Sequence, residues 1–346
     1  RLGVVTQKGL SANLRQQIKS PLGRYAALTL IWIAIVIGNA AYEGGNIGGA
    51  VLGLEALFGT SGLSFYPFLV GILVFMLLYL GNYRVLEKVF VFLVVIMSLS
   101  FFITALLTRP NVMELLKGMF TPSLPGKGVL TAISLVGTTL VPYNLFLHAS
   151  LVNEKWKTKD ALNLARRDTL IAIGLGGLVS MAIVVSASGI DGGTVTGVMD
   201  LAKGLEPLYG PMAHYCMGIG LFAAGVTSAL TAPLAAAYVT MNCFGWKGGF
   251  SDLRFRAVWI GILVLGTLFM SLEIKPLVVI KFAQVANGLL LPFIAFFLLW
   301  VVNRKSLMGN QANSPWQNLL GLVIILLVVF LGIRSVLPIF GFWDAQ

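Results

Sequence analysis

The stretch Gly137-Thr-Thr-Leu-Val-Pro-Tyr-Asn-Leu-Phe-Leu-His148 places polar groups in the middle of a long apolar segment. Pro142 has no N–H, so the carbonyl of Thr138, four residues earlier, loses its helical partner. The proline ring pushes Val141 away from helical backbone angles, and Gly137 adds backbone freedom. Hydrocarbon tolerates free carbonyls only where they are shielded or line a cavity. We therefore expect a broken membrane helix of the kind that forms transport sites.

The composition around this stretch excludes an ordinary soluble domain. Hydrophobic residues make up 58% of the 346 residues and charged residues 11%, which favours an all-α polytopic membrane protein. The apolar runs are too long and too continuous for a β-barrel. The net charge of +11 does not indicate nucleic-acid binding, because the basic residues lie in short loops between the runs. Cys216 and Cys243 fall in one apolar run, about 40 Å apart on a straight helix, so we expect no disulfide.

Nine apolar segments predict nine membrane helices in one transmembrane domain, residues 1–346. The predicted spans are roughly 25–55, 64–81, 88–107, 128–152, 169–189, 211–243, 255–273, 276–302 and 317–340. The first span is long, and we expect it to end near Gly45, with 46–59 as a bent continuation. Most Lys and Arg residues fall in alternate loops, which predicts that residues 1–23 are a basic cytoplasmic segment and that the C-terminus is outside. We expect a bacterial inner membrane.

Candidate cation ligands cluster in the broken span. Asn144 and His148 are four residues apart and share a helical face, whereas Tyr143 points about 100° away. Free carbonyls from Thr138 to Val141 would lie beside them. Carbonyl and amide oxygens suit Mg²⁺, Mn²⁺ or Ca²⁺. The alternative is a proline kink whose polar groups bond neighbouring helices.

Glu43 lies within the first span. A carboxylate inside a membrane is costly, so its default interpretation is a proton relay or cation attraction. The alternative places it at a helix end, facing water. Small-xxx-small patterns follow it and predict close helix packing that would hold Glu43 in the interior; they are formed by Gly44, Gly45, Gly48, Gly49 and Gly53.

Two further pairs of polar residues are candidates. Gln284 and Asn287 are three residues apart on one helical face, before Pro292, and their amides would complete a cation site or form interhelical hydrogen bonds. Arg254 and Arg256 begin a span at the predicted cytoplasmic edge, where the simplest role is an interfacial anchor. The chain has no H-E-x-x-H, G-x-S-x-G or G-x-x-x-x-G-K-[ST] pattern, so an enzyme and an ATP-driven pump are both disfavoured.

The broken span resembles a known family. Val141-Pro-Tyr-Asn-Leu-Phe-Leu-His-Ala-Ser150 is similar to the sixth-helix signature Met-Pro-His-Asn-Leu-Tyr-Leu-His-Ser of Nramp (natural resistance-associated macrophage protein) divalent-metal transporters. Residues 1–6, 115–125 and 283–293 also resemble family segments, in the same order. The resemblance implies the LeuT-like fold of five-plus-five inverted repeats, with the nine spans as helices three to eleven. It also implies an N-terminal truncation that removes helices one and two and their Asp-Pro-Gly-Asn metal-binding segment.

The resemblance assigns roles to residues of the broken span. Thr138 takes the place of a residue whose carbonyl binds metal in some states, and Asn144 matches the signature. Val141 replaces the methionine whose thioether is a metal ligand. Tyr143 replaces the first histidine of the signature. His148 matches the second, which is linked to proton movement.

Other roles implied by the resemblance lie outside the broken span. Glu43 matches one of two acidic residues of the third helix. Gln284 matches a glutamine near the metal, while Leu290 replaces a second one. Arg254 and Arg256 resemble arginines near the proton exit.

These departures are similar to those of Nramp-related magnesium transporters, because valine offers no sulfur and oxygen ligands admit harder ions. We predict a secondary transporter that imports Mn²⁺, Mg²⁺ or both by alternating access, with Fe²⁺ a further candidate. The cation is the substrate, and no cofactor is expected. Expected partners are the bilayer and, if Glu43 and His148 relay them, protons; we expect no nucleic acid and no obligate protein partner. The alternatives are a permease for amino acids or other organic solutes and, from another class, a membrane-embedded enzyme that uses Glu43 with His148.

Overall fold

The computed structural model describes residues 1–59, 64–81, 84–121, 142–188, 198–246, 248, 250–272 and 276–336. Every regular element in these ranges is helical, in agreement with the all-α prediction. Gly137, Thr138 and Val141 lie outside the described residues. The side chains of Pro142, Gln284 and Asn287 are likewise not described, although their backbone is.

Each predicted span contains a helix in the part of the chain that the structure describes. The longer helices are α3 (Pro21–Phe58), α4 (Tyr66–Leu80), α5 (Arg84–Leu107), α8 (Pro142–Lys155), α9 (Leu162–Ser188), α12 (Ala213–Phe244), α13 (Leu253–Met270), α14 (Pro276–Val302) and α16 (Pro315–Val336). The shorter ones are α1 (Leu2–Thr6), α2 (Leu10–Gln17), α6 (Val112–Phe120), α10 (Val198–Lys203), α11 (Glu206–Tyr209) and α15 (Lys305–Met308). By length and hydropathy, five helical segments within the described ranges could each cross a membrane, and the end of α14 forms a sixth with the bent segment after it, at 64°.

Helix α3 is a single helix of 38 residues, so the expected end near Gly45 is wrong. Ser20 caps its start by accepting a hydrogen bond from the Gly23 amide at 3.3 Å, and Gly59, at φ 84°, ends it. Glycine permits a bend but does not impose one, because its amide still donates to the helical ladder. Here the glycines are contact points: a Cβ at Gly53 would lie 2.5 Å from the Phe222 amide of α12.

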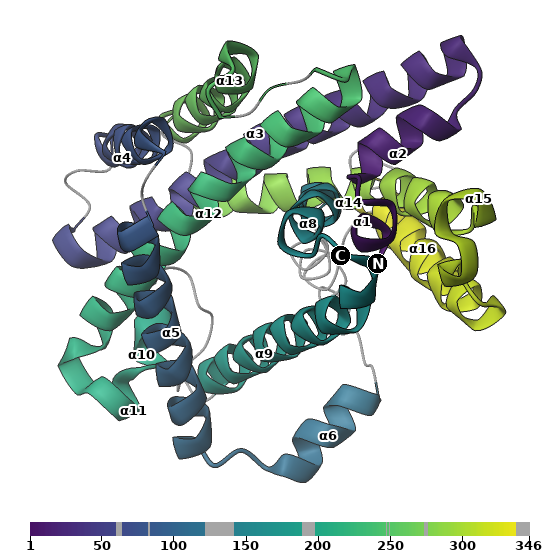
Figure 1. Cartoon of the computed structure of the whole chain (residues 1–346). Coiled ribbons are helices and arrows are strands. Elements are labelled where there is room, and N and C mark those ends of the chain that lie inside the picture. The colour runs from purple at the N-terminus through teal and green to yellow at the C-terminus, as the bar shows by residue number, and fades with distance from the viewer. Residues whose placement is uncertain are drawn as a thin grey trace.

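Helices α3 and α12 run side by side through the centre of the bundle (Figure 1). Small residues of α12 face α3: a Cβ at Gly225 would clash with the Ala50 amide, and one at Gly218 would lie 3.0 Å from the Gly53 carbonyl. Trp32 of α3 donates to the hydroxyl of Thr240 at 3.1 Å. Small residues let two backbones approach closely in a membrane, which confirms the packing predicted from the glycine pattern. The two cysteines of α12 are both free, as expected.

The N-terminal segment is more ordered than its polar sequence suggests. Helices α1 and α2 bury Val4, Leu10 and Leu14 completely. The buried side chain of Asn13 donates to the Thr6 hydroxyl at 2.9 Å and to the Gly9 carbonyl at 2.9 Å. The segment therefore packs on the helices; its cytoplasmic location stays a prediction.

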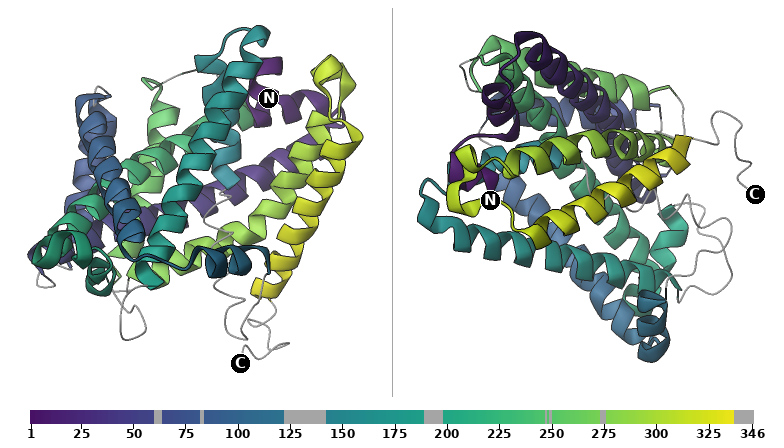
Figure 2. Two further views of the ribbon diagram at one scale, coloured as in Figure 1. Left: turned by 90° about the horizontal axis from the view of Figure 1, so that it is seen from below. Right: turned by 90° about the vertical axis from the view of Figure 1, so that its right-hand side faces the viewer.

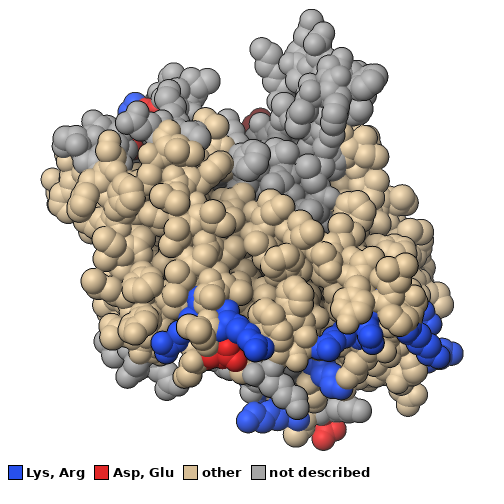
Figure 3. All heavy atoms as spheres, turned by 90° about the horizontal axis from the view of Figure 1, so that it is seen from above, with Lys and Arg blue, Asp and Glu red and all other residues tan. Residues whose placement is uncertain are grey.

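The outer surface of the bundle is apolar. Large hydrophobic side chains of α4, α5, α9 and α16 are exposed, among them Ile173 of α9 at 70% and Phe330 of α16 at 57%. Figure 3 shows most of the Lys and Arg side chains in view along one edge of a broad uncharged face, with a smaller charged group near the opposite edge. A wide exposed apolar band with basic residues at one edge is the pattern of a membrane-embedded protein.

Candidate functional site

Helix α8 begins at Pro142. A proline suits the first turn of a helix, because its missing N–H would have no helical partner there. The residues on the other side of the predicted break, including Gly137, Thr138 and Val141, lie outside the described part of the chain. The free carbonyls expected there remain a prediction.

The two faces of α8 differ sharply. Tyr143 is 6% exposed and packs with Phe146 in the core, and its ring meets that of Tyr42 edge-on at 5.8 Å. Asn144 and His148 lie together on an exposed face. The structure therefore brings Asn144 and His148 together and directs Tyr143 toward α3.

His148 lines a cavity of about 520 Å³ between α1, α8, α14 and α16. The walls are mostly apolar, and the polar lining besides His148 consists of Arg1, Asn313 and Gln317. Arg1 donates to Gln317 at 3.0 Å and also to Asn313. Sequence reasoning missed Asn313 and Gln317. The available signal was a helix start at Ser314, whose hydroxyl accepts from the Gln317 amide at 3.3 Å.

Glu43 lies in the middle of α3 and is fully buried, which excludes a position at a helix end facing water. Asn46 donates to its Oε2 at 3.3 Å, and Oε1 has no hydrogen-bond partner among the described residues. The carboxylate stem packs on α13, where a Cβ at Gly266 would lie 2.5 Å from the Glu43 Cγ. A buried carboxylate with an unsatisfied oxygen is costly, so this position calls for a functional explanation.

Further polar and small groups surround Glu43. Asn39, one helical turn earlier, is 1% exposed, and its Nδ2 has no partner within the described ranges. On α14, Val279 approaches the same part of α3, since a Cβ at Gly44 would lie 3.1 Å from its Cγ1. The backbone of Gln284 and Asn287 continues along α14 from this contact. The described residues hold no group of three or more His, Cys, Asp or Glu side chains that could bind a metal.

Arg254 and Arg256 lie at the start of α13, away from Glu43. The guanidinium of Arg254 sits 5.2 Å from the ring centroid of Trp246, and that of Arg256 is equally far from Tyr79. Arg256 also donates through Nε to the Phe250 carbonyl at 3.1 Å. Gly266 lies about 15 Å further along the helix axis than Arg256. Both arginines thus make contacts with aromatic rings and backbone at the start of α13, and their role stays a prediction.

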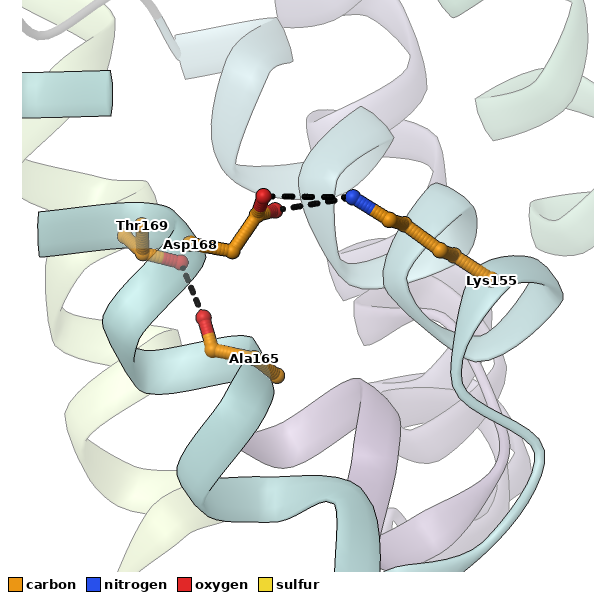
Figure 4. A network of polar contacts seen from close by, with 4 residues as sticks. All are labelled: Lys155, Ala165, Asp168 and Thr169. Carbon is orange, nitrogen blue, oxygen red and sulfur yellow. Dashed lines mark hydrogen bonds and ion pairs between the residues drawn. The ribbon is translucent and has the colours of Figure 1, made fainter. Parts of the chain in front are cut away.

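The far end of α8 is tied to α9. Lys155 donates to both carboxylate oxygens of Asp168 at 3.2 Å, and the Thr169 hydroxyl donates to the Ala165 carbonyl at 2.9 Å (Figure 4). Both side chains of the ion pair are more than half exposed, so the pair contributes little to stability. It orients the end of α8 without fixing it.

Comparisons with known proteins agree on one family. A family model described as natural resistance-associated macrophage protein-like matches residues 1–338. The "divalent metal cation transporter MntH" of Klebsiella pneumoniae (strain 342) is 27% identical over 340 residues, which span 96% of this chain and 80% of that protein. The protein of the same name from Caldanaerobacter subterraneus is 26% identical over 313 residues, 87% of this chain and 73% of its own length.

A solved structure gives the same picture of the fold. The Eremococcus coleocola manganese transporter, in complex with an aromatic bis-isothiourea compound, superimposes with a TM-score of 0.77. The match covers 97% of this chain and 75% of that one, at 20% identity. This likeness confirms the predicted LeuT-like transporter fold.

Proposed function

The chain belongs to the Nramp family, and from this premise we propose that it carries divalent metal cations across a membrane by alternating access. The relatives named above are metal transporters, and the bundle described here has the apolar outer surface of an integral membrane protein. The cation is the substrate of this activity.

The observation that carries the proposal is the enclosed carboxylate of Glu43. It lies where α3 meets α13 and α14, and Tyr143 of α8 packs against Tyr42, the residue before it on α3. Asn144 and His148 follow on α8. A carboxylate in such a place attracts a cation or relays a proton. We propose that Glu43 and His148 relay protons, while Thr138, Asn144, Gln284 and Asn287 offer oxygens to the metal.

The proposed substrates are Mn²⁺ and Mg²⁺, with Fe²⁺ as a further candidate. Mn²⁺ is named for the structural relative and accepts oxygen ligands. Val141 stands where the family signature has methionine, so the site as proposed has no sulfur ligand. Oxygen ligands alone favour hard ions, including a partly hydrated Mg²⁺.

Flux measurements test the proposal. The protein, expressed from its complete gene, is reconstituted in liposomes that contain a metal-sensitive dye, beside a manganese transporter of the family as a positive control. We expect Mn²⁺ and Mg²⁺ uptake above that of empty liposomes. Absence of both fluxes while the control transports would overturn the proposal.

Substitution of Glu43 tests the proposed proton relay. Glu43→Gln keeps the size of the side chain and removes its charge, and Glu55→Gln, a partly exposed acid of the same helix, is the matched control. With a pH dye inside the liposomes, we expect metal-driven acidification to fall to background only in Glu43→Gln. Unchanged acidification in Glu43→Gln would exclude Glu43 from the relay.

The membrane orientation belongs to the same proposal. Basic residues gather along one edge of the bundle (Figure 3), and the positive-inside rule places that edge in the cytoplasm. We propose that residues 1–23 face the cytoplasm of a bacterial inner membrane and that the C-terminus is outside. Single cysteines introduced at Lys8 and after Gln346 test this orientation. A labelling reagent that does not cross the membrane shows on which side of the membrane each cysteine lies.

A further inference from the structure

Helix α6 (Val112–Phe120) stands apart from the bundle in Figure 1. Its start is capped by Asn111, whose side-chain oxygen accepts from the amides of Met113 at 3.1 Å and Glu114 at 3.4 Å. None of its nine residues is buried. The helix is therefore well formed locally, and among its residues only Leu115 is half-buried in the described structure.

Its side chains divide into two faces. With about 100° per residue, five of the six large apolar side chains fall on one face, and Leu115 lies to one side of it. We call this face the α6 stripe, formed by Val112, Met113, Leu116, Met119 and Phe120. Glu114 lies opposite the stripe, and Lys117 lies at its edge, beside Met113. The stripe is strongly exposed, with Met113 at 74% and Phe120 at 75%. Such a face needs an apolar partner.

The turn before α6 directs it away from the axis of α5. Arg109 adopts a left-handed backbone conformation, at φ 46°, and Pro110 follows. The Thr108 hydroxyl donates to the Ala105 carbonyl at 2.8 Å and closes the last turn of α5. Figure 2 places α6 at the end of the bundle opposite the N-terminus, and in the left view it runs across the long helices.

The apolar surface of α5 leads directly to α6. At the end of α5, Ile103, Leu106 and Leu107 are exposed at 44%, 65% and 52%, and this helix passes the length and hydropathy test for a membrane span from Leu86 to Leu107. The end of a spanning helix lies at the boundary between hydrocarbon and headgroups. Helix α6 begins after only residues 108–111 and therefore lies at the same level.

We propose that α6 is an interfacial helix whose partner is the lipid–water boundary of the bilayer, on the side opposite α1 and α2. The α6 stripe lies among the upper parts of the acyl chains, and Glu114 and Lys117 face the headgroups and water. A second copy of the chain is a poorer partner, because nine residues offer far less area than the roughly 800 Å² per partner of a stable interface. The proposal does not depend on which solute the protein carries.

Spin labels on the two faces of α6 test this inference. The variants Met119→Cys and Phe120→Cys report on the stripe. Glu114→Cys, on the opposite face of the same helix, is the control, and Lys117→Cys reports on the edge of the stripe. All carry Cys216→Ala, since Cys243 is buried. Leu322→Cys, on the exposed face of α16, and Lys8→Cys serve as lipid and water references. The labelled protein is placed in phosphatidylcholine–phosphatidylglycerol vesicles.

Oxygen concentrates in the membrane, whereas a polar nickel chelate stays in water. We expect the ratio of oxygen to nickel accessibility at positions 119 and 120 to approach that at Leu322 and to exceed, severalfold, the ratio at 114, with position 117 in between. High nickel accessibility at all four positions would overturn the proposal. Low accessibility to both reagents at 119 and 120, with dipolar broadening between labels, would also overturn it and indicate a second copy instead.

Discussion

Glu43 on α3 and His148 on α8 are the two ionisable groups of the proposed proton relay, and their surroundings are opposite. Glu43 is fully enclosed: Gly266 of α13 packs against its side chain, and Asn46 of the same helix donates to its carboxylate. His148 faces a cavity of about 520 Å³. The enclosed group depends on how tightly helices pack around it. The open group depends on what enters the cavity, so the two should respond to different substitutions.

Gly266→Ala should produce the largest effect, because it acts on the enclosed side. A Cβ at Gly266 would lie 2.5 Å from the Glu43 Cγ and 2.7 Å from its Cβ, so α3 and α13 must separate. Such overpacking costs about 1–3 kcal/mol. We expect a lower melting temperature in detergent and loss of metal-driven acidification.

Gly261→Ala is the matched control for this substitution. It lies on the same helix, and a Cβ there would meet nothing within 4 Å. We expect its melting temperature and its flux to match those of the native protein. If Gly266→Ala and Gly261→Ala had the same melting temperature and the same acidification, the activity of Glu43 would not depend on tight packing against α13.

Val141→Met should produce an intermediate effect, on the metal itself. A thioether adds a soft ligand and should raise the affinity for Mn²⁺ and Cd²⁺ relative to Mg²⁺, by about tenfold or 1.4 kcal/mol. Competition between these ions in the flux assay measures the ratio. Val141→Leu, which adds bulk without sulfur, is the control. An unchanged ratio in Val141→Met would mean that this side chain does not reach the ion.

Arg254→Gln should have the smallest effect, because it touches neither side. Its contact with Trp246 is exposed, and exposed pairs of this kind contribute about 0.5–1 kcal/mol. We expect a slightly lower melting temperature with unchanged metal flux and unchanged acidification. Loss of acidification alone would instead place Arg254 in the proton pathway.

The sequence was sufficient to predict the elements with strong periodic or compositional signals. Nine apolar runs predicted nine helical regions, and each contains a helix in the described structure. The small-xxx-small pattern after Glu43 predicted close packing, which the contact of Gly53 with α12 confirms. Both signals depend on the local composition of the chain, so they can be recognised without knowing which helices pack together.

Other features depend on contacts between distant residues and could not be predicted. Helix α3 continues without a break past Gly45 and packs on α12, whereas glycine alone suggested a break. The contact between Glu43 and Gly266 joins residues of two separate helices. The order of α1 and α2 likewise depends on burial of Leu10 and Leu14 against the bundle. Of the candidate site, the sequence located Glu43, Asn144 and His148, and the roles of all three stay predictions.

The length of α3 has a mechanical consequence. Its 38 residues extend about 57 Å, nearly twice the roughly 30 Å of a bilayer's hydrocarbon core, so the helix must lean or protrude. A rigid rod that changes its lean sweeps its ends through wide arcs and moves its middle least. Glu43 lies within one turn of the midpoint of α3 and thus near the fulcrum. When bilayer thickness changes the lean, the depth of this carboxylate should change little.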